Sequence, residues 1–213
     1  MRDTLTAETK KSHTEGTVFM RTAEVTRTTK ETSIQVKLNL DGSGESDIST
    51  GIGFMDHMLT LFAKHGNFDL TLKAAGDLEV DCHHTMEDMG LALGEAINKA
   101  LGDKCGIRRY GNFLLPMDET LALVALDLSG RPYLVYDVKP AVAYIKDMDT
   151  ALFKEFFVAL CNKGGVNLHI KMLAAGETHH IFEAVFKGFA RSLSEAVSID
   201  PRVKGVPSTK GTL

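Results

Sequence analysis

The chain has 213 residues, enough for one large domain or two small ones with a proper hydrophobic core. Hydrophobic residues make up 44% and charged residues 24%, as is ordinary for globular proteins that live in water. The net charge of -4 gives no basic surface for nucleic acid, and no apolar run approaches the ~18–20 residues that cross a bilayer. The three cysteines are odd in number and unpatterned, which favours a cytoplasmic protein over a disulfide framework.

The chain order indicates two copies of one design between two short end segments. Residues 1–20 are polar and are interpreted as a flexible lead-in, not a signal peptide. Residues 21–104 form a first half-repeat and residues 105–200 a second, and residues 201–213 form a C-terminal tail. We expect residues 21–213 to act as a single catalytic domain.

Each half begins with the same predicted strand. Apolar residues alternate with polar ones over residues 34–40 and again over residues 122–128, and a period of two marks a half-buried strand. Each run follows a matching tripeptide, 30–32 or 118–120, and ends in a turn signal.

A short helix, a strand and a long helix follow in each half. The short helices are expected to end at Gly66 and Gly164, which are plausible C-cap glycines. The long helices carry apolar stripes with helical spacing of three and four, in the same register in both copies. The stripes are Met86, Met89, Leu93, Ile97 and Leu101, and Phe182, Val185, Phe189, Leu193 and Val197. These patterns predict an α/β (α+β) fold, internally duplicated, with two helices on one face of a mainly antiparallel or mixed sheet in each half.

The most informative motif is a His-His-x-x-Glu unit that occurs once in each half. It comprises His83, His84 and Glu87 in the first copy. The second copy comprises His179, His180 and Glu183. On a helix, residues i and i+4 share a face, so the first His and the Glu of each unit can bind one metal ion. Two copies in matched surroundings predict a duplicated metal-binding unit.

Alignment of the halves extends the predicted ligands to two sets of four. His57 aligns with Glu155, at the start of each short helix. One set is His57, His84, His179 and Glu183, and the other is Glu155, His180, His83 and Glu87. Whether the two halves that share a set belong to one chain or to neighbouring chains stays open. Imidazole and carboxylate without thiolate favour a borderline to hard divalent ion, with Mn²⁺ first and Zn²⁺, Fe²⁺ or Co²⁺ as substitutes.

With these motifs, the sequence resembles the imidazoleglycerol-phosphate dehydratase family. The resemblance rests on residues 53–59, the two His-His-x-x-Glu units, residues 128–133 and residues 208–211, and runs from about Arg21 to Leu213. It implies dehydration of D-erythro-imidazole-glycerol phosphate to imidazole-acetol phosphate in L-histidine biosynthesis, by a hydro-lyase. It also implies four strands and two helices per half, two Mn²⁺ ions per active site, and sites between the subunits of a homo-24-mer.

The resemblance also assigns roles to single residues. Glu31 is expected near the leaving hydroxyl as an acid–base group, and Glu183 in the other proton transfer, with His65 and Lys187 lining the same site. The substrate phosphate is expected to meet Arg109 and Arg131, with Arg108 a weaker choice, because arginine gives bidentate contacts to phosphate oxygens. The tail is expected to add Ser208, Thr209 and Lys210.

At the position of Glu155 the family usually has a His, so this site is expected to carry extra negative charge.

Two other functions remain open on the residues alone. A dinuclear hydrolase would use the same ligands to make a metal hydroxide, although the motifs show no obvious bridging carboxylate. A metal-storage or structural shell would use the ions only to join subunits, which leaves the predicted phosphate-binding cations without a role.

Overall fold

A computed structural model describes residues 21–213, and the lead-in predicted for residues 1–20 lies outside the described residues. The first half contains β1 (Thr22–Thr28), β2 (Thr32–Asn39), β3 (Ser46–Ser49), α1 (Gly53–Gly66), β4 (Asp69–Gly76) and α2 (His83–Leu101). The second half contains β5 (Tyr110–Met117), β6 (Thr120–Asp127), β7 (Tyr133–Asp137), α3 (Leu152–Gly164), β10 (Asn167–Ala174) and α4 (Thr178–Val197). A small hairpin, β8 (Tyr144–Ile145) and β9 (Met148–Asp149), is an addition of the second half that the sequence patterns did not predict.

The two halves have the same sheet topology, which confirms the predicted duplication. Their strand orders are β1-β2-β4-β3 and β5-β6-β10-β7, four strands in each sheet. In each sheet one pair is parallel, β3 with β4 or β7 with β10, and the other pairs are antiparallel. The sheets are therefore mixed, as expected.

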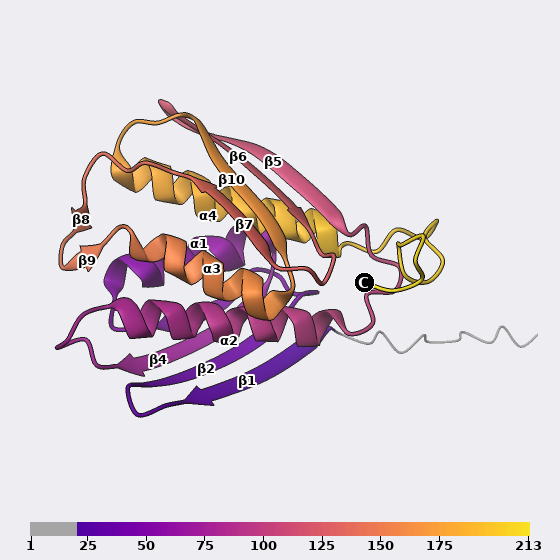
Figure 1. Cartoon of the computed structure of the whole chain (residues 1–213), viewed down its shortest axis with the longest axis horizontal. Coiled ribbons are helices and arrows are strands. Elements are labelled where there is room, and N and C mark those ends of the chain that lie inside the picture. Colours follow the sequence, from indigo (N-terminus) through magenta and orange to yellow (C-terminus); the bar gives the residue numbers. More distant parts are fainter. Residues whose placement is uncertain (1–20) are drawn as a thin grey trace, which may run out of the picture.

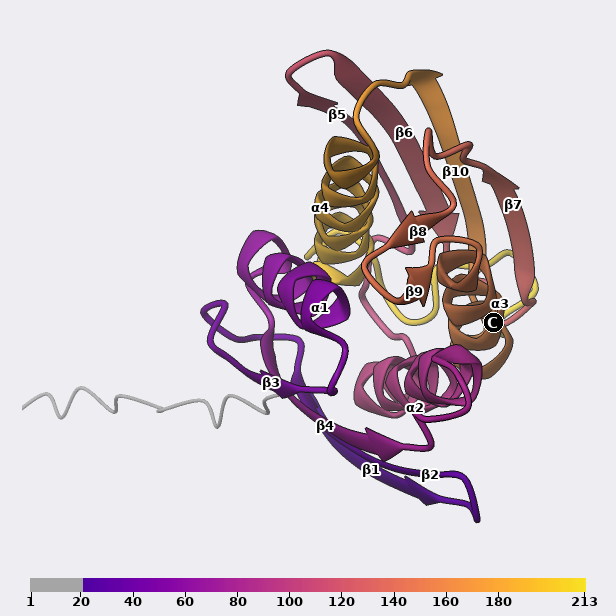
Figure 2. The same cartoon turned by 90° about the vertical axis from the view of Figure 1, so that its left-hand side faces the viewer.

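The four helices form a double layer between the two sheets (Figures 1 and 2). α2 lies on β1 and β2, and α4 lies on β5 and β6. Across the middle, α2 packs on α3 and α1 packs on α4, so each helix of one half contacts a helix of the other. The apolar face that each half leaves uncovered is thus buried within the same chain, and residues from both halves come together at the helix ends.

The predicted apolar stripes form the shared core. Every residue of both long-helix stripes is buried, as are the inward-facing residues of 34–40 and 122–128. Phe62 of α1 stacks on Phe189 of α4 with ring centroids 5.4 Å apart, which joins the halves. The contact between α2 and α3 is close enough to require glycine, because a Cβ at Gly90 would lie 2.3 Å from the carbonyl oxygen of Phe156.

The predicted ends of the short helices are confirmed, but the C-cap residues lie one position further along the chain. Gly66 and Gly164 are the last helical residues, and the left-handed C-cap residues are Asn67 (φ 56) and Gly165 (φ 62). Gly66 has a packing role instead, because a Cβ there would lie 2.3 Å from the Phe68 ring. Within residues 21–213, no helix combines the length and apolar character needed to cross a membrane.

Candidate active site

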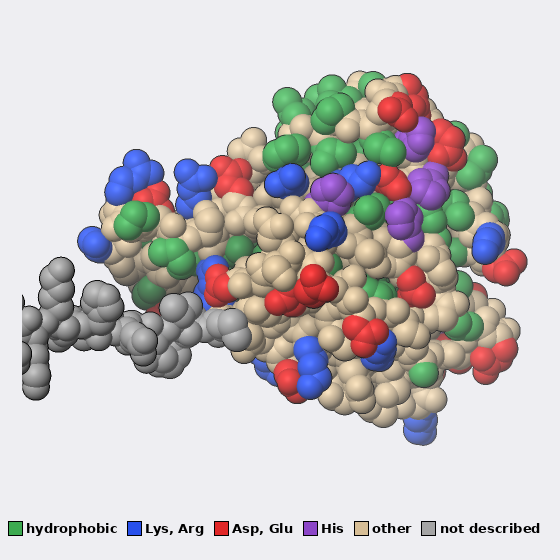
Figure 3. All heavy atoms as spheres, turned by 180° about the vertical axis from the view of Figure 1, so that it is seen from behind, with side chains coloured by type: hydrophobic (Ala, Val, Ile, Leu, Met, Phe, Trp, Pro, Cys, Tyr) green, Lys and Arg blue, Asp and Glu red, His purple; other side chains and the backbone are tan. Residues whose placement is uncertain are grey.

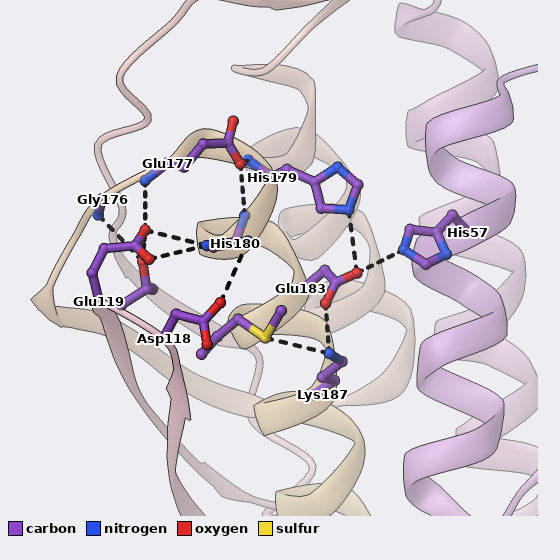
Figure 4. A network of polar contacts seen from close by, with 11 residues as sticks. His57, Asp118, Glu119, Gly176, Glu177, His179, His180, Glu183 and Lys187 are labelled. Carbon is purple, nitrogen blue, oxygen red and sulfur yellow. Dashed lines mark hydrogen bonds and ion pairs between the residues drawn. The ribbon is translucent and has the colours of Figure 1, made fainter.

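Three of the predicted metal ligands converge where α1 of the first half meets α4 of the second (Figure 4). Nε2 of His57 lies 2.8 Å from Oε1 of Glu183, and Nε2 of His179 lies 3.2 Å from the same oxygen. The Glu177 carboxylate starts α4 by accepting the backbone N–H groups of His179 and His180. Because the helix begins there, His179 and Glu183 lie one turn apart on one face, as the i,i+4 spacing predicted.

This cluster, His57 with His179 and Glu183, has the donor chemistry of a divalent metal site. One potential ligand atom from each of the three residues lies within 4.8 Å of the other two. The imidazole side chains are 41% and 48% exposed, whereas the Glu183 side chain is only 10% exposed. An ion there would be held against a buried carboxylate with its outer side open. The histidine side chains that gather on one face of the molecule lie among acidic and basic side chains (Figure 3).

The charge of Glu183 is balanced within the chain by Lys187. Nζ of Lys187 lies 2.5 Å from Oε2 of Glu183. Burial raises the pKa of Glu183, but hydrogen bonds from Lys187, His57 and His179 outweigh it and lower the pKa to about 2. Burial, followed by the charges of Lys187 and Arg191, lowers the pKa of His65, and the charge of Glu183 partly opposes this. The structure therefore brings His65 and Lys187 to the Glu183 site, as expected.

His180 points away from this cluster into a second group of acidic residues. Its Nδ1 atom lies 3.0 Å from Oε2 of Glu119, and its Nε2 atom lies 3.9 Å from Oδ2 of Asp118. Asp118, Glu119 and His180 also have ligand atoms within 4.8 Å of one another. The sequence motifs indicate no role for Asp118 or Glu119, although Glu119 aligns with Glu31 in the repeat.

The first-half unit is arranged similarly but more loosely. Nε2 of His83 lies 3.9 Å from Oε2 of Glu87. Nδ1 of His84 lies 2.9 Å from Oδ2 of Asp77 and 3.8 Å from Oε2 of Glu31. Asp77 was missed because it lies in a loop, where no periodicity marks it.

The predicted four-ligand sets are thus only partly assembled in one chain. The first set is complete except for His84, which lies with Asp77 and Glu31 instead. Of the second set, His83 and Glu87 are neighbours, and His180 lies with Glu119. Within residues 21–213, Glu155 does not join a group of three potential ligands.

The predicted phosphate-binding arginines meet at the other end of the second half. Nε and Nη2 of Arg109 contact both carboxylate oxygens of Asp127, at 2.7 and 3.0 Å, and Nη1 donates to the carbonyl of Pro207 at 2.9 Å. Nη2 of Arg131 lies 4.0 Å from the same Asp127, and its side chain is 68% exposed. Arg131 is therefore the more available cation.

The tail lies beside this pair of arginines but is folded on itself. Ser208 accepts the N–H of Lys210 at its hydroxyl oxygen and the N–H of Gly211 at its carbonyl oxygen. Arg108, the weaker phosphate candidate, pairs with Glu195. The structure thus places residues 207–211 near Arg109 through Pro207, and it directs Arg108 elsewhere.

The metal-ligand cluster and these arginines lie at opposite ends of α4. The backbone N–H of Arg109 donates to the carbonyl of Ala196, near the C-terminal end of that helix. His179 stands near its N-terminal end, which places the two regions about 25 Å apart at 1.5 Å per residue. A small phosphorylated molecule cannot reach both within one chain.

Comparison with known proteins identifies the family. The profile of the imidazoleglycerol-phosphate dehydratase family matches residues 50–193. The chain belongs to the imidazoleglycerol-phosphate dehydratase family. It is a hydro-lyase, and this membership decides against the hydrolase and storage-shell alternatives.

Curated members of the imidazoleglycerol-phosphate dehydratase family are similar over almost their full length. The protein from Lachnoclostridium phytofermentans is 60% identical over 193 residues, covering 91% of this chain and 98% of that protein. The protein from Acetivibrio thermocellus is 58% identical over 193 residues, covering 91% of this chain and 99% of that protein.

Two crystal structures of imidazoleglycerol-phosphate dehydratases share the fold. The Staphylococcus aureus enzyme has a TM-score of 0.76 at 37% identity and covers 84% of this chain and 99% of its own. The Pyrococcus furiosus enzyme, solved with the compound (S)-C348, has a TM-score of 0.77 at 39% identity and covers 89% of this chain and 100% of its own. The duplicated α/β architecture is therefore that of the family.

Proposed function

We propose that this chain dehydrates D-erythro-imidazole-glycerol phosphate to imidazole-acetol phosphate in L-histidine biosynthesis, as a Mn²⁺-dependent cytoplasmic enzyme. The observation that carries the proposal is the convergence of His57, His179 and Glu183, contributed by both halves of the repeat. The three cysteines, all of them free, fit a reducing compartment.

The donor set fits two Mn²⁺ ions per active site, with other divalent ions as substitutes. Imidazole nitrogens and carboxylate oxygens suit a borderline to hard ion. The first ion would be held by His57, His179 and Glu183, with His84 as the fourth ligand. The second would be held by His83, Glu87 and Glu155, with His180 as the fourth.

The fourth ligand of each set is best supplied by a neighbouring copy. His84 and His180 each leave Nε2 available on a half-exposed side chain, and each points away from the set it would complete. The predicted phosphate-binding arginines also require a second copy, because they lie about 25 Å from the cluster along α4. Both observations support sites between subunits, and the number of subunits, a homo-24-mer, rests on the family resemblance alone.

The reaction removes a hydroxyl from the carbon beside the imidazole ring and a proton from the adjoining carbon, and the resulting enol becomes the ketone of imidazole-acetol phosphate. Bound divalent ions would act as Lewis acids on the substrate's imidazole ring, favour loss of its N–H proton, and so let the ring donate electrons as the hydroxyl leaves. Glu183, ionised beside Lys187, would take part in removing the proton from the adjoining carbon. The positive charge of Lys187 would stabilise a developing anion.

Glu31 serves as the acid–base group for the departing hydroxyl. Its side chain is 55% exposed and lies on the open side of His84, at 3.8 Å. A carboxyl group in that position can protonate the hydroxyl as it leaves as water. His65, whose pKa is lowered by burial, would line the same site.

Arg131 and Arg109 would bind the phosphate, with Ser208, Thr209 and Lys210 closing on it. Arg131 is exposed, and Asp127 keeps Arg109 fixed in place. A bidentate guanidinium contact suits phosphate oxygens. The tail would add hydroxyl groups, backbone N–H groups and one lysine charge.

The decisive test is turnover of imidazole glycerol phosphate by chelator-stripped protein titrated with Mn²⁺. We expect no activity when the protein is stripped, and full activity near two ions per chain. Tight Mn²⁺ binding without turnover would overturn the proposed reaction. The Glu31→Gln variant should bind Mn²⁺ normally yet lose turnover, because only the acid–base group has been changed.

A further inference from the structure

His84 and His180, the second histidines of the two His-His-x-x-Glu units, share one feature. Each has its Nδ1 atom hydrogen-bonded to a carboxylate, at 2.9 Å from Asp77 and 3.0 Å from Glu119 respectively. A ring whose Nδ1–H donates to a carboxylate has its Nε2 lone pair free for a metal. The two histidines are equivalent in the repeat, but their two carboxylates are not.

Asp77 comes from a loop segment that is longer in the first half. Six residues, 77–82, separate Gly76 from His83, whereas only two, Glu177 and Thr178, separate Gly176 from His179. The last part of each loop caps the start of the helix that follows. Asp81 accepts the N–H of His83 and Glu177 accepts the N–H of His179, both at 2.7 Å. The additional residues supply Asp77, whose side chain is only 17% exposed against His84.

In the second half, the carboxylate comes from the β5–β6 turn. Glu119 lies immediately before β6, at the position that aligns with Glu31 before β2. Besides His180, it accepts the backbone N–H of Glu177 at 2.8 Å (Figure 4). A Cβ at Gly176 would lie 2.1 Å from Oε1 of Glu119, so a glycine is needed there for the carboxylate to reach the start of α4.

In the first half, Glu31 does not make the close contact with a histidine that Glu119 makes in the second. It approaches Nδ1 of His84 only to 3.8 Å and stays 55% exposed, whereas Asp77 holds the nitrogen at 2.9 Å. The two equivalent glutamates therefore differ in their contacts. Glu119 is hydrogen-bonded to a histidine, whereas Glu31 is mostly exposed to solvent.

We propose that Asp77 and Glu119 are positioning residues that orient His84 and His180 through Nδ1 and present Nε2 to a metal ion, and that the longer loop of the first half thereby frees Glu31 for chemistry. The proposal rests on the metal role given above to the two histidines. Neither Asp77 nor Glu119 contacts the metal or the substrate in it. Their effect passes through the imidazole ring.

The first experiment measures Mn²⁺ affinity, by competition with a chromophoric chelator, for the full chain stripped of metal. Removing the carboxylate in Glu119→Ala is expected to weaken binding about 10- to 100-fold, the usual cost of losing an outer-shell partner. Glu119→Gln keeps an acceptor oxygen and should lose less. Glu24→Ala removes an exposed, ion-paired strand glutamate and is the matched control.

A spectroscopic readout separates positioning from general damage to the fold. In ¹⁵N-histidine spectra of the metal-free chain above pH 8, where imidazoles are neutral, His180 should show the tautomer protonated at Nδ1. That signature should be lost in Glu119→Ala and weakened in Gly176→Ala, where the added methyl group displaces Glu119. It should be unchanged in Glu24→Ala.

Asp77→Ala should behave differently, because Glu31 is near enough to replace the lost carboxylate. We expect Mn²⁺ affinity to fall less than in Glu119→Ala, and kcat to fall because Glu31 is diverted to His84. If Glu119→Ala binds Mn²⁺ as tightly as Glu24→Ala and keeps the tautomer, the inference is overturned while the dehydratase function stands. A wild-type chain that neither binds Mn²⁺ nor turns over substrate would overturn both.

Discussion

His57 and Glu183 lie 126 positions apart in the chain, yet Nε2 of the first is 2.8 Å from Oε1 of the second. The contact depends on the packing of α1 on α4, which the stacked rings of Phe62 and Phe189 fix below it. Because those rings are buried, the spacing of the His57 and Glu183 side chains is set by the packing of the core. The geometry of this part of the proposed metal site is therefore preorganised by the core.

Loss of His57 should remove metal binding without unfolding the protein. The side chain is 41% exposed, so His57→Ala leaves the core intact. We expect Mn²⁺ affinity to fall by at least the ~10- to 100-fold that outer-shell partners cost, and activity to fall with it. Chelator competition and steady-state kinetics measure the two effects. His169→Ala, an exposed histidine on β10, is the control, and an equal loss in that variant would contradict the assignment.

Glu155→His should change which metal the second site prefers. A carboxylate there favours harder ions such as Mn²⁺, whereas an imidazole favours Zn²⁺. We expect the variant to gain affinity for Zn²⁺ relative to Mn²⁺. Paired titrations of wild type and variant with both ions test this, and an unchanged affinity ratio would remove Glu155 from the ligand set.

Arg131→Ala should weaken substrate binding with little effect on stability. Its side chain is 68% exposed and only 4.0 Å from its nearest carboxylate, so little packing is lost. One charge-assisted contact to phosphate contributes about 1.5–3 kcal/mol, so KM should rise roughly 10- to 100-fold. Arg131→Lys should recover part of this, since charge remains but the bidentate fork is lost. Arg108→Ala, which breaks only the pair with Glu195, should leave KM unchanged.

The ion pair of Arg21 and Asp41 should make part of the stability depend on pH. The Arg21 guanidinium lowers the pKa of Asp41, an effect that burial partly opposes. Since the pKa is lower in the folded state, the stabilisation is present above the unfolded value of ~3.9 and is lost as pH falls through the folded value. Arg21 also donates to the carbonyl of Val197 at 2.5 Å, so its side chain links the start of β1 to the end of α4.

For Asp41→Asn we therefore expect the free energy of unfolding to drop by about 1 kcal/mol at pH 7. The difference from wild type should be smaller at pH 2 than at pH 7. Urea unfolding of metal-free protein at both pH values measures it. A difference that is the same at pH 2 as at pH 7 would show that Asp41 acts through its shape and not through its charge.

The sequence by itself determined the duplicated fold and the type of site. Buried positions recur with period two in residues 34–40 and 122–128, because a sheet with one face on the core requires it. The long helices repeat their stripes for the same reason. The His-His-x-x-Glu spacing determined that His179 and Glu183 would share a face, since helix geometry is local.

Tertiary structure alone decided which donors meet. His57 reaches Glu183 because α1 packs on α4, and the helix pairing depends on how side chains from both halves fill a common core. Asp77, Glu119 and Asp127 were not predicted because carboxylates in turns and at strand ends carry no periodic signal. The partners of Glu119 and Asp127 also lie 61 and 18 positions away in the chain. The cluster of His57, His179 and Glu183 and the arginines could both be predicted from sequence motifs. Only the packed structure shows that they lie at opposite ends of α4, because no local pattern encodes the distance between them.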